Sequence, residues 1–394
     1  MTGNRNMEYE ISKCVEKLAP SGIRAFFDLV LGMKDVISLG VGEPDFSTPW
    51  RVREKAIDSL EQGYTSYTSN KGMLELRRDI NDFLESRHGM RYDPEEETLV
   101  TVGVSEGLDL AARAILNPGD KVLIPEPCYV SYGPVIELAA GVPVFLKTDL
   151  KSKFKMTPDQ IDAACGKGVK AMMINYPSNP TGASYTKNEL RAIAEVVKKR
   201  GLLVLSDEIY DELTYDFDHT PLASLPGMKE HVLYFNGFSK SYAMTGFRIG
   251  WVNGPAKIIA AMTKIHQYTM LCASITGQMA AREALRSGLK EVHVMKREYR
   301  RRRNFIVDAL NQIGLDCLMP EGAFYVFPSI KKIGMPSLDF AKKLLEKEKV
   351  ALVPGVAFGP SCEGYIRISY ASSYDNLKEA VRRITYFCNE IRKK

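Results

Sequence analysis

The sequence has little of what marks secreted, membrane-spanning or metal-binding proteins. Its seven cysteines are scattered without a C-x-x-C pair and its five histidines are isolated along the chain, so neither a disulfide framework nor a zinc site is indicated. No apolar run approaches the roughly 20 residues that a membrane span needs, and the polar segment 1–13 lacks the apolar core of a signal peptide. We therefore expect a cytoplasmic protein that holds no metal and does not bind a membrane.

Charge of one sign is also scarce. The net charge is only +5 over 394 residues, which does not favour a nucleic-acid partner. The basic run Arg300-Arg-Arg-Arg303 lies in a helix expected to begin near Lys290, and no aromatic stacking residues or glycine-rich segments accompany it. We interpret this run as the solvated face of the helix, and we expect no nucleic acid to bind.

Strand and helix patterns alternate between residues 98 and 236. Short apolar runs such as 170–175 predict buried strands, and the amphipathic segments between them predict helices. This alternation favours an α/β fold with a mostly parallel sheet, joined by right-handed crossovers and flanked by helices. A smaller α/β unit follows, with strands expected at 322–327, 350–353 and 365–370 and helices at 337–348 and 375–392.

These patterns divide the chain into three parts. Residues 1–49 are expected to form an N-terminal arm, helical over 8–34, together with part of a small domain. Residues 50–287 are expected to form a large domain that ends in a helical stretch at 255–287. The small domain is then completed by residues 288–394. The length of the chain is sufficient for two such domains with substantial cores.

The segment 231–251 places two cations beside buried strands. Val232 to Phe235 predicts a strand, and a second strand is expected from Phe247 onward. Lys240 lies on the tight turn between them, where both flanks draw it toward the interior. A lysine with little water around it loses its proton more easily, and the neutral amine can form a Schiff base. Arg248 could grip a phosphate in the same pocket, although the segment alone is equally compatible with two incidental cations.

Three further features lie at the ends of expected strands or within them. The sequence Asn179-Pro-Thr-Gly182 predicts a rigid turn at the carboxyl end of a strand, where open α/β sheets bind ligands. Asp207 ends a fully apolar strand, with Tyr210 three residues later, and Arg367 lies between two isoleucines. Because a buried charge needs a partner, these side chains either form structural salt bridges or face a bound ligand.

Together these motifs resemble the aspartate aminotransferase superfamily, the class I and II pyridoxal-phosphate (PLP) aminotransferases. The N-P-T-G turn, the pair Asp207 and Tyr210, the lysine motif Ser239-Lys240 with Arg248, and a buried arginine occur in that family in the same order. The resemblance extends over nearly the whole chain. It implies fold type I, with a large domain containing a mostly parallel sheet and a smaller α/β domain, PLP as the cofactor, and a homodimer with shared active sites.

The resemblance also implies roles for individual residues. Lys240 would hold PLP as a Schiff base and shuttle the Cα proton, while Asp207 would keep the pyridine nitrogen protonated. Asn179 and Tyr210 would hydrogen-bond the phenolic oxygen of the ring, and Asn179 would also border the substrate. It further implies that Arg367 and Gly42 contact the substrate carboxylate and that Tyr129 stacks on the cofactor ring. The phosphate would be bound by Val104, Ser105, Ser239 and Arg248 of the same subunit and by Tyr67 of the partner subunit.

The implied activity is transfer of the amino group of an L-amino acid to a 2-oxo acid such as 2-oxoglutarate by a ping-pong mechanism. Two positions depart from the family pattern: Gly237 stands where a phosphate-binding serine is common, and no arginine lies between His266 and Ala281 to pair with a side-chain carboxylate. We therefore expect an aromatic or hydrophobic amino donor. An aspartate aminotransferase and a PLP-dependent β-C–S lyase on the same fold are the alternatives.

Overall fold

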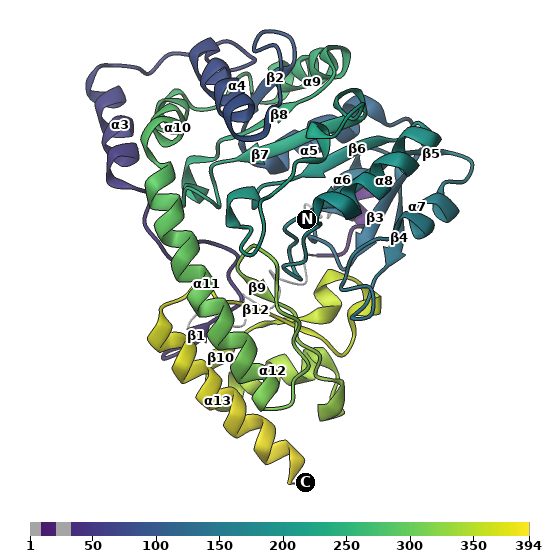
Figure 1. Ribbon diagram of the computed structural model, residues 1–394, viewed down its shortest axis with the longest axis vertical. Helices are drawn as coiled ribbons and strands as arrows, with labels where there is room; N and C mark the ends of the chain where they lie inside the picture. The colour runs from purple at the N-terminus through teal and green to yellow at the C-terminus, as the bar shows by residue number, and fades with distance from the viewer. Residues whose placement is uncertain (1–8, 21–32, 394) are drawn as a thin grey trace, which may run out of the picture.

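Seven strands form one sheet in the upper half of the molecule as drawn in Figure 1. The computed structural model describes residues 9–20 and 33–393. Neighbouring strands are parallel except at β8, which runs antiparallel to the strand on either side. In spatial order the strands are β2 (Thr98–Thr101), β8 (Gly250–Asn253), β7 (Val232–Gly237), β6 (Leu203–Asp207), β5 (Val169–Asn175), β3 (Lys121–Glu126) and β4 (Val142–Lys147).

Both faces of this sheet are buried. Val204 and Val232 belong to one hydrophobic cluster, whereas their neighbours Leu205 and Leu233 belong to a second cluster on the other face. Strands buried on both faces have continuous apolar sequences, which is why the runs in β5, β6 and β7 are recognisable from the sequence. The α/β fold with a mostly parallel sheet is confirmed.

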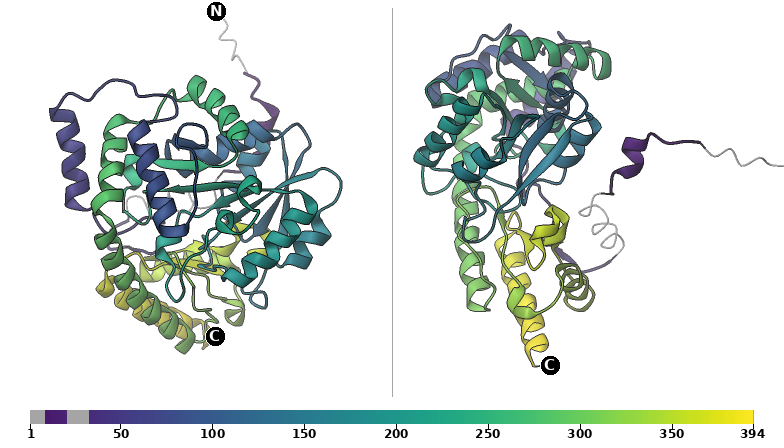
Figure 2. Two further views of the ribbon diagram at one scale, coloured as in Figure 1. Left: turned by 45° about the horizontal axis from the view of Figure 1, so that its top comes forward. Right: turned by 90° about the vertical axis from the view of Figure 1, so that its right-hand side faces the viewer.

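Helices cover the two faces of the sheet (Figures 1 and 2). Residues of α5, α6 and α9 join the cluster of Leu205, and residues of α4, α8 and α10 join that of Val204. The stretch expected to be helical over 255–287 is two helices, because Leu271 has a φ of 68° and Ser274 caps α10. The helices are α3 (Trp50–Glu61), α4 (Leu74–His88), α5 (Gly103–Ile115), α6 (Tyr132–Leu138), α7 (Pro158–Ala164), α8 (Lys187–Arg200), α9 (Ala256–Thr269) and α10 (Ile275–Ser287).

A smaller group of elements lies below the large sheet in Figure 1. The long helix α11 (Leu289–Gln312) runs from the upper part into this lower part, where α12 (Ser337–Glu348) and α13 (Tyr374–Arg392) pack. Its antiparallel sheet has the order β11 (Val353–Pro354), β12 (Ile366–Ser369) and β9 (Tyr325–Val326). The early strand β1 (Ile37–Ser38) pairs in parallel with β10 (Val350–Ala351), so the segment before residue 49 joins this lower part.

The N-terminal arm is described only in part. Helix α1 spans Lys13–Lys17, and residues 21–32 of the helical arm expected over 8–34 lie outside the described residues. The side chains of Tyr9, Ile11 and Val15 are exposed. None of the helices within residues 9–20 and 33–393 combines the length and the apolar character that crossing a bilayer requires.

The basic run of α11 does not form one solvated face, so that expectation is wrong for half of the run. Arg300 and Arg301 are exposed, but Arg302 and Arg303 are buried and form ion pairs. Arg302 Nη1 lies 2.8 Å from an Asp45 carboxylate oxygen, and Arg303 Nη1 lies 2.6 Å from Asp216 Oδ2. Because successive side chains on a helix point about 100° apart, four consecutive arginines cannot share one face.

Candidate active site

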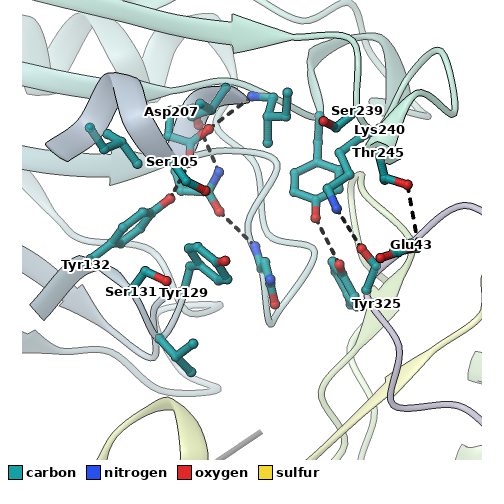
Figure 3. Close-up of a pocket in the computed structure, with 18 of the residues that line it drawn as sticks. Glu43, Ser105, Tyr129, Ser131, Tyr132, Asp207, Ser239, Lys240, Thr245 and Tyr325 are labelled. Atoms are coloured by element: carbon teal, nitrogen blue, oxygen red, sulfur yellow. Dashed lines mark hydrogen bonds between the residues drawn. The ribbon is translucent and has the colours of Figure 1, made fainter. Parts of the chain in front are cut away.

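A cavity of about 900 Å³ opens where the large sheet meets the lower part of the molecule (Figure 3). The carboxyl ends of β5, β6 and β7 and the N-terminus of α5 reach it from one side, and β9 and β12 from the other. Such strand ends are the usual ligand site of an open α/β sheet. The cavity brings together all the predicted site residues except Tyr67: Gly42, Val104, Ser105, Tyr129, Asn179, Asp207, Tyr210, Ser239, Lys240, Arg248 and Arg367.

Lys240 projects from the turn after β7 into this cavity (Figure 3). Its Nζ donates a hydrogen bond of 2.7 Å to the carbonyl oxygen of Gly42. Burial lowers the pKa of Lys240 to about 8, although the nearby carboxylate of Glu43 opposes the shift. The turn approaches β8 so closely that a Cβ at position 237 would lie 2.9 Å from the carbonyl oxygen of Ile249. This contact explains why glycine stands at 237.

Asp207 ends β6 and is buried without a cationic partner. The Tyr132 hydroxyl donates to Oδ2 at 2.6 Å, and the backbone N–H of Ile209 donates to Oδ1 at 3.3 Å. Burial raises the pKa of Asp207 to about 6, even though both hydrogen bonds favour the ionised form. No Lys, Arg or His nitrogen among the described residues lies within 4.0 Å of this carboxylate. Asp207 therefore forms no structural salt bridge among the described residues, and the carboxylate of Asp207 faces the cavity.

Arg367 lies in β12 as a fully buried cation. One guanidinium nitrogen donates to Asn179 Oδ1 at 2.9 Å and another to the carbonyl oxygen of Gly40. The guanidinium also lies over the rings of Tyr325 and Phe358, 4.7 and 5.0 Å from their centroids. Burial lowers the pKa of Arg367, and no carboxylate of the described residues forms an ion pair with it. A buried cation in this state is suited to an anionic ligand.

The N-terminus of α5 forms an anion site with Arg248. The backbone N–H groups at the start of this 13-residue helix are free to meet an anion, and Ser105 and Ser239 line the cavity beside them. Gly103 has a φ of 76°, and a Cβ there would lie 2.5 Å from Arg248 Nη2. A larger residue would therefore displace the guanidinium. A cation, two hydroxyls and helix N–H groups around one space fit a phosphate.

The sequence matches the family described as aminotransferase class I and II over residues 34–384. It is 54% identical over 380 residues to the Bacillus subtilis (strain 168) protein YugH, whose name places it among aminotransferases, covering 96% of this chain and 98% of that protein. It is 43% identical over 377 residues to an aspartate aminotransferase of Pyrococcus abyssi, covering 95% and 97%. The crystal structure of an aromatic aminotransferase from Pyrococcus horikoshii superposes with a TM-score of 0.89 at 42% identity, covering 94% and 99%.

The chain belongs to the class I and II aminotransferase family. It is therefore an enzyme that transfers amino groups between amino acids and 2-oxo acids, and the predicted family, fold type and reaction class are confirmed. Members of this family use PLP. In this aminotransferase the unpaired Asp207, the Lys240 amine and the anion site at Arg248 fit that group, because it offers a ring nitrogen, an aldehyde and a phosphate.

Sequence reasoning missed three lining residues whose side chains hydrogen-bond predicted residues of the aminotransferase site. Tyr132 donates to Asp207, and Asn175 accepts a hydrogen bond from the backbone N–H of Asn179 at 2.8 Å. Tyr325 places its hydroxyl 2.9 Å from that of Tyr210. The position of Asn175 at the end of an apolar strand was a usable signal. The two tyrosines gave none, because each partner lies more than 70 residues away in the sequence.

Tyr67 lies apart from the cavity of its own chain. Its side chain is 81% exposed, on the loop between α3 and α4. The structure describes one chain, so the prediction that Tyr67 acts in a partner's site stays a prediction.

Proposed function

We propose that this aminotransferase binds PLP through Lys240 and uses it to move the amino group of an L-amino acid to a 2-oxo acid by a ping-pong mechanism. The observation that carries the proposal is the cavity itself, which collects Lys240, Asp207, Arg248 and Arg367 and leaves the last three without an ion-pair partner among the described residues. When bound, PLP supplies an electron-accepting ring that takes up the electron pair released as the Cα–H bond of the substrate breaks.

The residues of the chain would then divide the work. The Lys240 amine, neutral in part near pH 7 because burial lowers its pKa to about 8, takes the Cα proton and returns it. The Asp207 carboxylate, ionised above a pKa of about 6, faces the ring nitrogen and keeps its proton in place. Asn179 and Tyr210 would hydrogen-bond the phenolic oxygen, and Tyr129 would cover the ring.

Two anion sites of the cavity would hold cofactor and substrate. Arg248, Ser239, Ser105 and the N–H of Val104 would bind the phosphate, joined by Tyr67 of the partner subunit. Arg367 would grip the substrate α-carboxylate beside Gly42. This two-point hold would orient the substrate Cα–H bond toward Lys240 and so favour loss of the proton over loss of carbon dioxide.

The composition of the lining supports an aromatic or hydrophobic amino donor. The cations among the lining residues are Lys240, Arg248 and Arg367, and each already has a role. No further lining cation is left to pair with the side-chain carboxylate of aspartate, which would be desolvated at a cost. Tyr129, Tyr325 and Val41 offer apolar surface instead.

We further propose that the enzyme is a cytoplasmic homodimer with shared active sites. Its large domain would span residues 50–287, and its small domain would comprise residues 288–394 with part of 1–49. The pairing of β1 with β10 supports this division, because it joins residues 37–38 to the C-terminal part of the chain.

A panel of amino donors tests the proposal. The PLP-loaded enzyme should convert 2-oxoglutarate to glutamate with phenylalanine, tyrosine or leucine, at a higher kcat/KM than with aspartate. An aspartate value tenfold above the others, about 1.4 kcal/mol of transition-state preference, would make it an aspartate aminotransferase. Release of pyruvate and a thiol from a β-thio amino acid, without glutamate formation, would instead identify a β-C–S lyase.

A further inference from the structure

Tyr325 lines the cavity and contacts residues from both sides of the site (Figure 3). Its side chain is fully buried in β9. Its hydroxyl lies 2.9 Å from the Tyr210 hydroxyl, and its ring lies under the Arg367 guanidinium at 4.7 Å. A Cβ at Gly42 would lie 2.7 Å from the same hydroxyl, so the loop that accepts the Lys240 hydrogen bond packs directly on Tyr325.

The Tyr210–Tyr325 hydrogen bond can have only one donor. If Tyr210 donates its proton to a cofactor oxygen, its own oxygen is free to accept, and Tyr325 must donate to it. Burial raises the pKa of both hydroxyls, and the Arg367 guanidinium lowers both, so each hydroxyl keeps its proton and can donate. A donor behind Tyr210 makes Tyr210 itself a stronger donor, because hydrogen bonds in a chain polarise one another.

We infer that Tyr325 is a positioning residue with two separable functions: its hydroxyl strengthens the hydrogen bond that Tyr210 makes to the cofactor, and its ring holds Arg367 in place for the substrate carboxylate. The inference rests on the proposed function, since it assumes that Tyr210 faces the bound cofactor. Tyr325 belongs to the lower part of the molecule and Tyr210 to the upper part, so the contact also ties the carboxylate site to the cofactor site.

The hydroxyl is tested by Tyr325→Phe in the PLP-loaded enzyme. The bound cofactor changes its absorbance with pH, and the midpoint of this change should rise by about one pH unit in the variant. The reason is that a weaker Tyr210 hydrogen bond stabilises the deprotonated cofactor less. Tyr210→Phe should raise this midpoint further. The double variant should match Tyr210→Phe alone, because the Tyr325 hydroxyl acts through Tyr210. A purely structural role would lower the melting temperature and leave the midpoint unchanged.

The ring is tested by comparing Tyr325→Phe with Tyr325→Leu. A carboxylate inhibitor such as 3-phenylpropanoate should bind Tyr325→Phe within about twofold of the unsubstituted enzyme and Tyr325→Leu at least about fivefold more weakly, since leucine offers the guanidinium no π face. Equal inhibition constants for the two variants would overturn the role of the ring, and an unmoved midpoint in Tyr325→Phe would overturn that of the hydroxyl. If the unsubstituted protein formed no chromophore with PLP, the proposed function would fail, and this inference with it.

Discussion

Burial moves the pKa values of Lys240 and Asp207 toward each other within one cavity. The pKa of Lys240 falls to about 8 and that of Asp207 rises to about 6, in both cases because the charged form loses water. At pH 7 the carboxylate is mostly ionised, and about a tenth of the amine is neutral, roughly two hundred times the fraction of an ordinary lysine. An enzyme that must attach an aldehyde at an amine and keep a nearby nitrogen protonated needs this combination.

The lowered pKa of Lys240 predicts how fast PLP attaches to the cofactor-free enzyme at different pH values. Only the neutral amine reacts, so the attachment rate should rise about tenfold per pH unit and level off above a pH of about 8. For the free amino acid derivative Nα-acetyl-lysine, the rate should keep rising up to a pH of about 10.4. Stopped-flow absorbance measures the rate, and borohydride reduction with peptide mapping confirms that the label is on Lys240.

Glu43 provides a matched control for that measurement. Its carboxylate raises the pKa of Lys240, so Glu43→Gln should move the plateau to lower pH. A rate that keeps rising to pH 10 in the unsubstituted enzyme, or label on a different lysine, would show that Lys240 is not the attachment residue.

At the scale of elements, an ion pair fixes the loop after β1 that reaches into the cavity. Arg302 of α11 donates to both carboxylate oxygens of Asp45 at 2.8 Å, and it lies 5.2 Å from the ring centroid of Phe46. Asp45 is three residues beyond Gly42, the hydrogen-bond acceptor of Lys240. The long helix therefore positions the loop that lines the cavity through Gly40 to Glu43.

Removing this ion pair should weaken both stability and substrate binding. Arg302→Met keeps the volume of the side chain but leaves Asp45 unpaired, which should cost about 1–3 kcal/mol, less than a fully buried pair because Asp45 remains a quarter exposed. The KM for the amino donor should rise in parallel. The exposed neighbour Arg301→Met should change stability by less than about 0.5 kcal/mol. Urea unfolding measures the free energy of unfolding, and steady-state kinetics measures KM. Equal effects of the two substitutions would contradict the role of Arg302 in positioning the loop.

The elements also show what the sequence could predict. The central strands of the large sheet were predictable because strands buried on both faces are continuous apolar runs, and the site followed because Asn179, Asp207 and Lys240 lie at or just after the ends of such runs. The edge strand β4, which is partly exposed, was not predicted. Contacts between distant segments were not predictable. The arginines of α11 divide between solvent and core according to carboxylates supplied by other elements, and the tyrosine hydroxyls at Asp207 and Tyr210 are brought there by the fold alone.

At the scale of the whole molecule, two exposed tyrosines lie on neighbouring segments, one of which is the loop that carries Tyr67. Asn70 donates to the carbonyl oxygen of Leu271 at 2.7 Å, which holds loop 63–72 against the turn between α9 and α10. Tyr67 on the loop and Tyr268 at the end of α9 are 81% and 86% exposed. Tyrosine is enriched at protein interfaces, and these two tyrosines lie on segments that contact each other. This surface supports the proposed homodimer.

A hybrid dimer tests whether Tyr67 acts in the site of its partner. One subunit carries Lys240→Ala and the other Tyr67→Phe, each with its own affinity tag, so that tandem purification isolates the hybrid. If Tyr67 crosses the interface, the Lys240 of the second subunit meets the intact Tyr67 of the first, and the hybrid keeps one native site. Its covalent PLP site should then bind with native affinity, whereas the Tyr67→Phe homodimer should bind about 10–100 times more weakly because a hydrogen bond to a charged group is lost. If Tyr67 acted within its own chain, the single Lys240 of the hybrid would lie beside the substituted residue. The hybrid would then bind PLP as weakly as the Tyr67→Phe homodimer. An active species that sediments as a monomer would likewise contradict the role of Tyr67 in the partner's site.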